Sequence, residues 1–222
     1  MHTLGRKPRS TRAGMTLIDL AIASSLLAVI LTAVGTASLR VQQASAALER
    51  QADLSRRTVR ALQRIADELH DVGIHTLDPD PTTQFGADSI EYQQPLGITT
   101  LGTVVWDAPA RLAFVLDPAE TENDLDDDAD GLVDEGRVEM TRDVGTADEV
   151  TVVLCRNVAG LFAGEIADNA LDDDGNTIVD EPGFAVRRVG DLIKIVLTLE
   201  ARGSSDETLR WTASTSVVLH NE

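Results

Sequence analysis

The sequence predicts an α+β fold in which one long N-terminal helix packs on a head of antiparallel β-sheet. Two observations predict it. An uncharged apolar run passes into an amphipathic helical pattern that ends near residue 73, and short strand candidates separated by turn residues begin near residue 89. The 222 residues are enough for one ordinary domain with an appendage, or at most two small domains.

Residues 1–14 form a leader with four basic side chains, Arg6, Lys7, Arg9 and Arg12, and no acid. Twenty uncharged residues then run from Leu20 to Leu39. In a helix they span about 30 Å, the thickness of the hydrocarbon core of a bilayer. Because a basic flank favours a cytoplasmic N-terminus, we expect residues 15–39 to cross a membrane once, with the head on the side opposite the cytoplasm.

Two simple explanations of this segment are incomplete. A secretory signal peptide has an apolar region of only about 7–15 residues, although Ala44-Ser45-Ala46 offers a cleavage site. A signal anchor fits the length but leaves Asp19 unexplained, because a carboxylate at the edge of an apolar span costs free energy and usually has a function.

Residues Gly14 to Leu20 read Gly-Met-Thr-Leu-Ile-Asp-Leu. With the basic leader and the apolar helix up to about Leu39, they resemble the processing site of type IV prepilins and type II secretion pseudopilins. In that family the leader ends in Gly, and an apolar residue followed by Thr-Leu-Ile-Glu-Leu starts the mature chain. The resemblance implies cleavage by prepilin peptidase between Gly14 and Met15, methylation of the new Met15 N-terminus, and assembly with other pilin or pseudopilin subunits through the N-terminal helix.

The chain departs from that pattern at two positions. Met15 stands where the family usually has Phe, and Asp19 stands where it usually has Glu. The resemblance implies that Asp19 pairs with the α-amine of Met15 on a neighbouring subunit. A carboxylate and an ammonium attract strongly at low dielectric and relieve each other's desolvation. The alternative is that Asp19 only caps its own helix.

Residues 40–73 are predicted to continue the same helix with an amphipathic pattern. Apolar residues recur at steps of three and four, arginines fall mostly on other faces, and Gly73 ends the pattern. A homodimeric coiled coil is the alternative, but the apolar positions persist for too few heptads.

Residues 74–222 form the predicted β-rich head. The strand candidates are 89–93, 103–106, 111–116, 137–142, 150–155, 192–200 and 208–219, the last two with an alternation that suits a sheet exposed to water on one face. A long N-terminal helix before a β head is the layout of the pilin family. The many strands and the closing pair resemble the larger minor subunits, the J-type of type II secretion or the W-type minor pilin.

Two acidic segments of the head repeat each other. Residues 123–135 match residues 169–181 at an offset of 46, with Leu-Asp-Asp-Asp in both. Oxygen-bearing side chains alternate, as calcium requires when six to eight oxygens converge on it. The predicted ligands are Asp126, Asp128, Asp130, the Leu132 carbonyl and Asp134 or Glu135 in the first segment, and Asp172, Asp174, Asn176, Asp180 and Glu181 in the second.

The match to an EF-hand loop is incomplete, because its twelfth position holds Arg137 or Gly183 instead of Glu. The second segment also has Thr177 in place of Gly131, so we expect it to bind calcium more weakly. The alternative is a pair of solvated acidic loops. However, six carboxylates crowd residues 126–135, and a cation would relieve their repulsion.

Bulk properties exclude some functions. The net charge of −18 argues against nucleic-acid binding, and a single cysteine, Cys155, allows no intrachain disulfide and reads as a buried thiol. The histidines are scattered and no hydrolase or nucleotide-binding motif occurs. We therefore expect a structural fibre subunit and no enzyme. A membrane-anchored calcium-dependent binding or adhesion module is the alternative.

Overall fold

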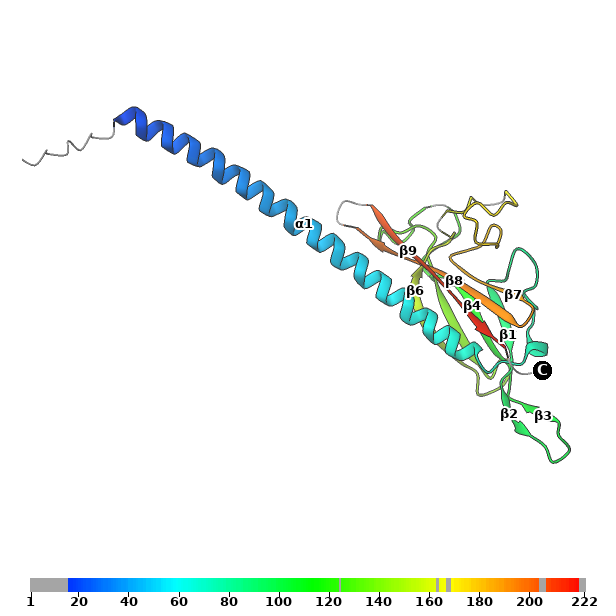
Figure 1. Ribbon diagram of the computed structural model, residues 1–222. Helices are drawn as coiled ribbons and strands as arrows, with labels where there is room; N and C mark the ends of the chain where they lie inside the picture. The colour runs from blue at the N-terminus through cyan, green and yellow to red at the C-terminus, as the bar shows by residue number, and fades with distance from the viewer. Residues whose placement is uncertain (1–15, 124, 163, 167–168, 204–206, 220–222) are drawn as a thin grey trace, which may run out of the picture. The chain divides into compact units, whose positions relative to one another are not determined.

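The computed structural model describes residues 16–219, apart from residues 124, 163, 167–168 and 204–206. The leader, Gly14 and Met15 lie outside the described residues, so cleavage and methylation remain predictions. The chain divides into two compact units, residues 1–46 and 47–222. The single long helix α1 (Leu17–Leu69) contributes to both and is described half by half (Figure 1).

Helix α1 begins with a capping box. The Asp19 carboxylate Oδ2 accepts hydrogen bonds from the Thr16 backbone N–H (3.0 Å) and hydroxyl (2.8 Å). The Thr16 hydroxyl oxygen accepts one from the Asp19 N–H (3.2 Å). Asp19 therefore caps its own helix, which was the alternative role considered for it from the sequence.

The first half of α1 is apolar on every side. All residues from Thr16 to Ser45 are exposed, and the helix contains a window long and apolar enough to cross a membrane. The hydroxyls of Ser24, Ser25, Thr32 and Thr36 donate to carbonyls three or four residues earlier. These polar groups are thereby satisfied inside the helix, as lipid requires. The segment suits a single membrane span or a signal sequence.

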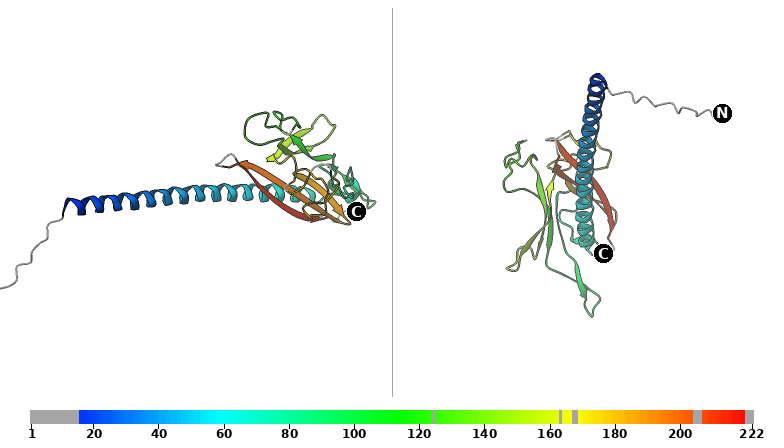
Figure 2. Two further views of the ribbon diagram at one scale, coloured as in Figure 1. Left: turned by 90° about the horizontal axis from the view of Figure 1, so that it is seen from above. Right: turned by 90° about the vertical axis from the view of Figure 1, so that its left-hand side faces the viewer.

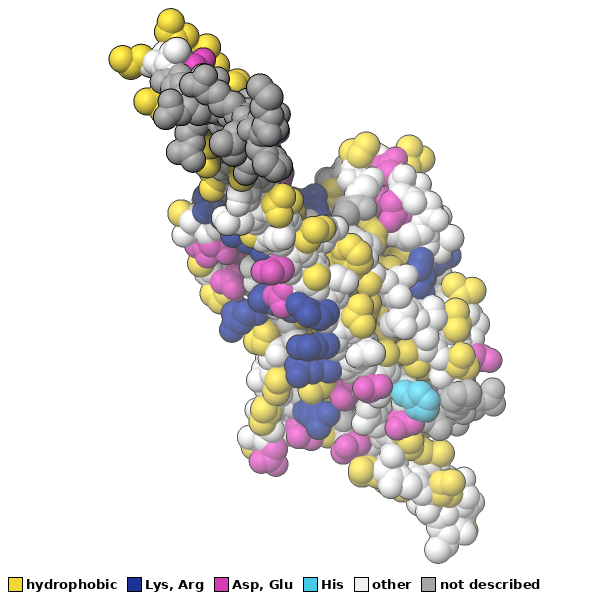
Figure 3. Space-filling view, turned by 60° about the vertical axis from the view of Figure 1, so that its left-hand side comes forward, with side chains coloured by type: hydrophobic (Ala, Val, Ile, Leu, Met, Phe, Trp, Pro, Cys, Tyr) yellow, Lys and Arg dark blue, Asp and Glu magenta, His cyan; other side chains and the backbone are white. Residues whose placement is uncertain are grey.

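The second half of α1 is amphipathic. One face is buried, through Leu54, Thr58, Ala61, Leu62, Ile65 and Leu69. The opposite face exposes Arg56, Arg57, Arg60 and Arg64, and basic side chains form a column on the molecular face shown in Figure 3. The spacing of three and four residues predicted this division.

The helix ends at Leu69, four residues before the predicted end at Gly73. The reason is tertiary. The Gly73 N–H donates to the Gln93 carbonyl (3.1 Å), and a Cβ at this glycine would overlap the Trp106 ring. Because that N–H is used by a neighbouring strand segment, the chain leaves the helix and enters a short 3₁₀ turn, η1 (Ile74–Thr76).

The head contains a seven-stranded antiparallel sheet, which confirms the predicted fold class. Its order is β1-β4-β5-β6-β8-β7, with β9 on the other edge of β8. A separate hairpin pairs β2 with β3. The strands are β1 (Ser89–Tyr92), β2 (Pro95–Ile98), β3 (Val104–Trp106), β4 (Ala110–Leu116), β5 (Gly136–Arg142), β6 (Val150–Val158), β7 (Phe184–Val189), β8 (Leu192–Arg202) and β9 (Thr208–Val218). All seven strand candidates are present, whereas β2 and β7 were not predicted.

The main core lies between α1 and one face of the sheet (Figures 1 and 2). Leu62 and Ile65 of the helix share it with Leu112, Phe184 and Leu197 of the strands. Removal of this apolar surface from water stabilises the head by about 25 cal/mol per Å². An apolar helix packed in this way on an antiparallel sheet is a pilin-like architecture.

Strand β8 corrects one expectation. Its residues from Ile193 to Glu200 are buried or half-buried on both faces, whereas β9 alternates between exposed and covered positions. The second face of β8 is covered by a smaller core of Phe162, Ile178, Ala185 and Val196. Two of these residues belong to the connection between β6 and β7. The connection between β6 and β7 therefore packs on the sheet.

The lone cysteine behaves as predicted. Cys155 is half-buried on β6, and burial raises the pKa of its thiol to about 12. A thiol with a raised pKa is a poor nucleophile at neutral pH, so its role is packing.

Candidate metal centres

The two repeated segments occupy matching places in the topology. The first acidic loop, residues 120–135, joins β4 to β5, and the second, residues 165–181, joins β6 to β7. Glu135 is followed directly by β5, and two residues separate Glu181 from β7.

The repeat extends to the hydrogen bonds. In the first loop, the Asp126 Oδ2 accepts from the Gly131 N–H (3.0 Å), and the Asp128 Oδ1 accepts from the Asp130 N–H (2.9 Å). In the second loop, the same bonds join Asp172 to Thr177 (2.8 Å) and Asp174 to Asn176 (2.8 Å). Short aspartate-to-backbone bonds of this kind fold a chain into a tight turn. Both loops therefore adopt one backbone design.

Left-handed backbone residues recur at matching positions. Gly131 has φ +93° and its counterpart Thr177 has φ +79°. Glycine adopts this region without cost, whereas a β-branched residue is strained there. The first loop therefore turns at a glycine, and the second loop makes the same turn with a less suitable residue.

A buried glutamate that sequence reasoning missed lies at the start of each loop. Glu120 and Glu165 are only 8% and 7% exposed. The Glu120 Oε1 accepts from the N–H groups of Asp127 (3.2 Å) and Asp128 (3.1 Å). The Glu165 Oε1 accepts from Asp173 (3.1 Å) and Asp174 (3.0 Å) in the same way.

These glutamates escaped the repeat because they are 45 residues apart, whereas the rest of the repeat is offset by 46. They also precede the matched segments. A search that allowed one inserted residue upstream of the second segment would have found the pair.

Carboxylate oxygens converge within each loop. Glu165, Asp174 and Glu181 each place an oxygen within 4.8 Å of the others in the second loop. In the first loop two groups meet the same limit, Glu120 with Asp126 and Asp128, and Asp128 with Asp130 and Glu135. Both include Asp128, the counterpart of Asp174. In the second loop the upstream glutamate, the middle aspartate and the last glutamate thus form one group, whereas in the first loop Asp128 links a group with Glu120 to a group with Glu135.

The last glutamate of each loop is buried, and one of its carboxylate oxygens has no hydrogen-bond donor among the described residues. Glu135 is 4% exposed and Glu181 is 0% exposed. Among the described residues, the Oε2 atom of each has no hydrogen-bond partner. A buried carboxylate oxygen without a partner is costly. A cation among these oxygens would satisfy it.

Burial and neighbouring charge disfavour the ionised form of these groups. Burial, followed by the carboxylates of Asp130, Glu120 and Asp128, raises the pKa of Glu135 to about 7. Burial also raises the pKa of Glu181, although a hydrogen bond from Asn176 opposes the shift. A divalent cation would reverse the balance by favouring the carboxylate.

Two further predicted ligands accept hydrogen bonds from the loop backbone. Asp134 and Asp180 accept hydrogen bonds from the N–H groups of Asn123 (3.1 Å) and Asn169 (3.2 Å), so they fix the entry to each loop. Neither belongs to a convergent group of the described residues. Leu132 is buried, and ligation by its carbonyl stays a prediction.

Cationic side chains of β7 and β8 lie against the loop backbones. Lys194 donates to the Asn176 carbonyl and Arg187 to the Thr177 carbonyl. Arg202 donates to the Asp130 carbonyl (3.3 Å), which is the counterpart of the Asn176 carbonyl. Each loop is therefore anchored to β8 by one basic side chain.

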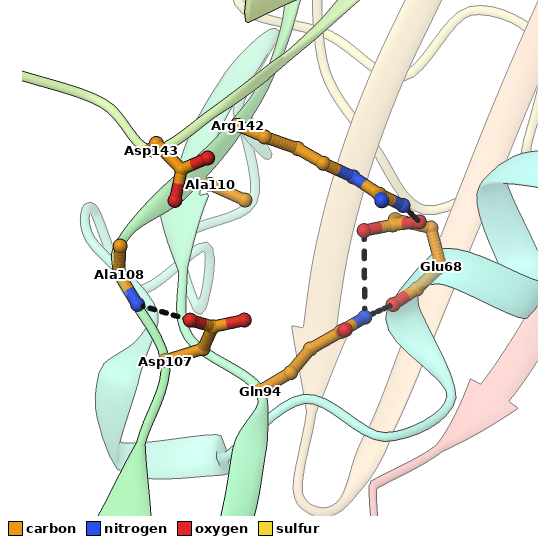
Figure 4. A pocket seen from close by; sticks show the side chains of 7 residues that line it. All are labelled: Glu68, Gln94, Asp107, Ala108, Ala110, Arg142 and Asp143. Carbon is orange, nitrogen blue, oxygen red and sulfur yellow. Dashed lines mark hydrogen bonds and ion pairs between the residues drawn. The ribbon is translucent and has the colours of Figure 1, made fainter. Parts of the chain in front are cut away.

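A small cavity of about 180 Å³ lies at the end of α1, away from these clusters, and is lined by Glu68, Gln94, Asp107, Ala108, Ala110, Arg142 and Asp143 (Figure 4). Its polar groups bond to one another. Arg142 pairs with Glu68 (3.0 Å), and the Gln94 amide donates to the Glu68 carbonyl (2.7 Å). It is smaller than a typical ligand pocket of about 300–1,000 Å³.

Comparison of the chain with models of known families, with curated proteins and with solved structures finds no match.

Proposed function

We propose that the chain is a subunit of a type IV pilin-like fibre, a pilus or a type II secretion pseudopilus, processed by prepilin peptidase between Gly14 and Met15. The observation that carries the proposal is the two-part helix α1. Its first half is apolar on every side, and its second half buries one face against an antiparallel sheet. This division suits a helix that leaves the membrane to pack among other helices while the sheet holds the head.

Asp19 is the residue that we expect to guide assembly. Both hydrogen bonds that its carboxylate accepts from Thr16 use Oδ2, and within the described residues Oδ1 accepts none. Capping its own helix thus leaves one carboxylate oxygen for the α-amine of Met15 on a neighbouring subunit. The two roles of Asp19 are compatible, because one carboxylate accepts several bonds.

Processing is tested by the mass of the chain extracted from membranes after co-expression with a prepilin peptidase. The expected product lacks residues 1–14, and Gly14→Ala abolishes the cut. Gly35→Ala is the matched control, because a Cβ there meets no atom within 4 Å, and it is cut normally. An intact N-terminus, or a cut after Ala46, would contradict the proposal and favour the anchored binding module.

Assembly is tested separately. Asp19→Asn keeps an oxygen that caps Thr16 but removes the charge, so the variant should be processed yet lost from the sheared fibre fraction. Asp53→Asn is the control, since Asp53 pairs with Arg57 (2.6 Å) on the same helix. A normal amount of the Asp19→Asn chain in fibres would show that this carboxylate has no role in assembly.

We place the chain among the minor subunits, of the J or W type. The head has seven strands in its main sheet, and β8 and β9 pair without interruption over eleven residues. The subunit sits in the cytoplasmic membrane with its head outside. It binds other subunits and lipid, and it has no catalytic role.

We further propose that each acidic loop binds one calcium ion, which braces the head. The donors are hard carboxylate and amide oxygens, the chemistry that calcium selects. Glu120 and Glu165 join the predicted ligand sets. We expect dissociation constants of about 10⁻⁴–10⁻³ M, in the range of extracellular calcium modules. Because the chain has one cysteine, metal ions supply the bracing that disulfides give many exported proteins.

The calcium proposal is tested by thermal unfolding of the full chain in detergent. Millimolar calcium should raise the melting temperature, because a ligand that binds only the folded state stabilises it. The Asp126→Ala/Asp128→Ala variant should show a smaller rise. Equal stabilisation of this variant would exclude the first centre as described.

A further inference from the structure

We propose that the two acidic loops bind calcium as a coupled pair, so that an ion in either loop raises the affinity of the other. This inference rests on the calcium centres proposed above and adds how they regulate each other.

Strand pairing places the end of the first loop beside the start of the second connection. Glu135 is followed directly by Gly136, the first residue of β5. In the β5–β6 register, Gly136 lies opposite Val158, the last residue of β6. The chain leaving the first centre and the chain leading to the second are therefore neighbours.

Gly160 brings the two connections into backbone contact. A Cβ at Gly160 would lie 2.7 Å from the Asp134 carbonyl oxygen, closer than real Cβ atoms approach other atoms. Asp134 adjoins Glu135. Any shift of the first loop at Asp134 therefore moves Gly160 or opens a gap beside it.

The base of the second loop is closed by backbone hydrogen bonds. Ala159 donates to the Thr198 carbonyl (3.1 Å), Thr198 to Gly183 (2.7 Å), and Gly183 to Ala159 (3.1 Å). Phe162 donates to the Glu181 carbonyl (3.1 Å). The route from Glu135 to Glu181 thus consists of backbone contacts with little freedom to absorb a displacement.

A shared floor provides a second connection. Arg202 and Lys194 of β8 contact the carbonyls of Asp130 and Asn176, which hold the same position in the two loops. Ordering one loop therefore helps to order the strand beneath the other.

The coupling arises because the first ion bears most of the free-energy cost of ordering the two loops. A first ion must gather mutually repelling carboxylates and fix its loop. The second ion then finds a loop whose base is already held, and it binds more tightly. Repulsion between the ions is weak by comparison, because the first loop carries at least seven carboxylates, Glu120 and six within 126–135, against the two charges of calcium.

The test is calorimetric titration of the full chain in detergent with calcium chloride. Glu135→Gln leaves only the second centre and Glu181→Gln leaves only the first. We expect the overall two-ion binding constant of the wild type to exceed the product of the two single-centre constants about fivefold or more. Linkage also requires that the remaining centre of each variant bind calcium more weakly than the same centre of the wild type does when the other centre is occupied. The factor must be the same for both centres.

Gly160→Ala separates coupling from ligation, because it removes no ligand. It should bring the overall constant close to the product of the single-centre constants, whereas Gly35→Ala should change nothing. Circular dichroism checks that each variant is folded, and the Gln pair keeps the test decisive if Gly160→Ala is not. Two centres that bind independently in the wild type would overturn the coupling and leave the calcium proposal standing. No binding in the wild type would overturn both, while the processing test of the fibre proposal would be unaffected.

Discussion

The two acidic loops share one backbone but differ in how each meets its own charge. In the second loop, the Asn176 amide donates to the Glu181 Oε1 and to the Asp174 Oδ2 (2.8 Å). The first loop has Asp130 at this position, a carboxylate with no N–H to offer. With asparagine in place of aspartate, an internal hydrogen bond therefore satisfies carboxylate oxygens that a cation would otherwise satisfy.

This difference indicates which of the two loops depends more strongly on a metal ion. The pKa of Glu135 is raised to about 7 by burial and by three neighbouring carboxylates. Glu181 is more deeply buried, yet the hydrogen bond from Asn176 opposes the rise of its pKa. The first loop thus retains the larger electrostatic cost without an ion, and we expect it to bind calcium more tightly.

The largest expected effect comes from the two upstream glutamates. Glu120→Gln should weaken calcium binding at the first loop by about 10–100-fold, because one charged ligand is lost. Glu165→Gln should act equally on the second loop. Glutamine keeps the oxygen that accepts the backbone hydrogen bonds, so the loops should still fold. Calorimetric titration measures both constants.

Glu122→Gln is the matched control for this pair. Glu122 is exposed and belongs to no convergent group of the described residues, so its removal should leave both affinities within about twofold. Unchanged binding in Glu120→Gln would exclude that glutamate as a ligand.

A smaller effect should follow from making the second loop resemble the first. Asn176→Asp should raise the calcium affinity of the second loop about tenfold, since ligand charge sets affinity in such loops. Without calcium, the same change should destabilise the head by about 1–3 kcal/mol, because Glu181 loses its hydrogen-bond donor. Melting curves with calcium and with a chelator separate these effects. A variant equally stable in chelator would argue that the amide bond contributes nothing.

The smallest effect concerns backbone strain. Thr177 holds φ +79° where the first loop has glycine, so Thr177→Gly should stabilise the head by about 1 kcal/mol. The melting temperature would rise by roughly 2–4 °C for a chain of this size. Gly131→Ala should do the opposite, since its Cβ would lie 2.7 Å from the Arg202 side chain. If both substitutions were neutral, the left-handed turn would not be a source of strain.

The sequence by itself determined the elements whose signals are local. The apolar run and the three-to-four spacing gave helix α1 to within a few residues, because each face of a helix is written at fixed intervals in the chain. Seven strands followed from short strand-like runs bounded by turn residues, and the ligand-like Asp126, Asp128 and Asp130 from their alternation. What was missed had no such pattern. β7 carries two arginines in six residues, and β2 contains both proline and glycine.

Features that depend on contacts between residues separated in the chain could be found only in the tertiary structure. Glu120 and Glu165 became part of the centres because the chain folds back over six to nine residues to meet them, and no periodicity records that return. The helix stopped at Leu69 because the Gly73 N–H bonds to the Gln93 carbonyl and the Trp106 ring packs against Gly73. β8 became buried on both faces because Phe162 and Ile178 of the β6–β7 connection pack on the face that was predicted to be exposed to water. Local pattern fixes which residues can form an element or a ligand set. Long-range packing fixes which of them meet, since loop closure and burial are properties of the whole chain.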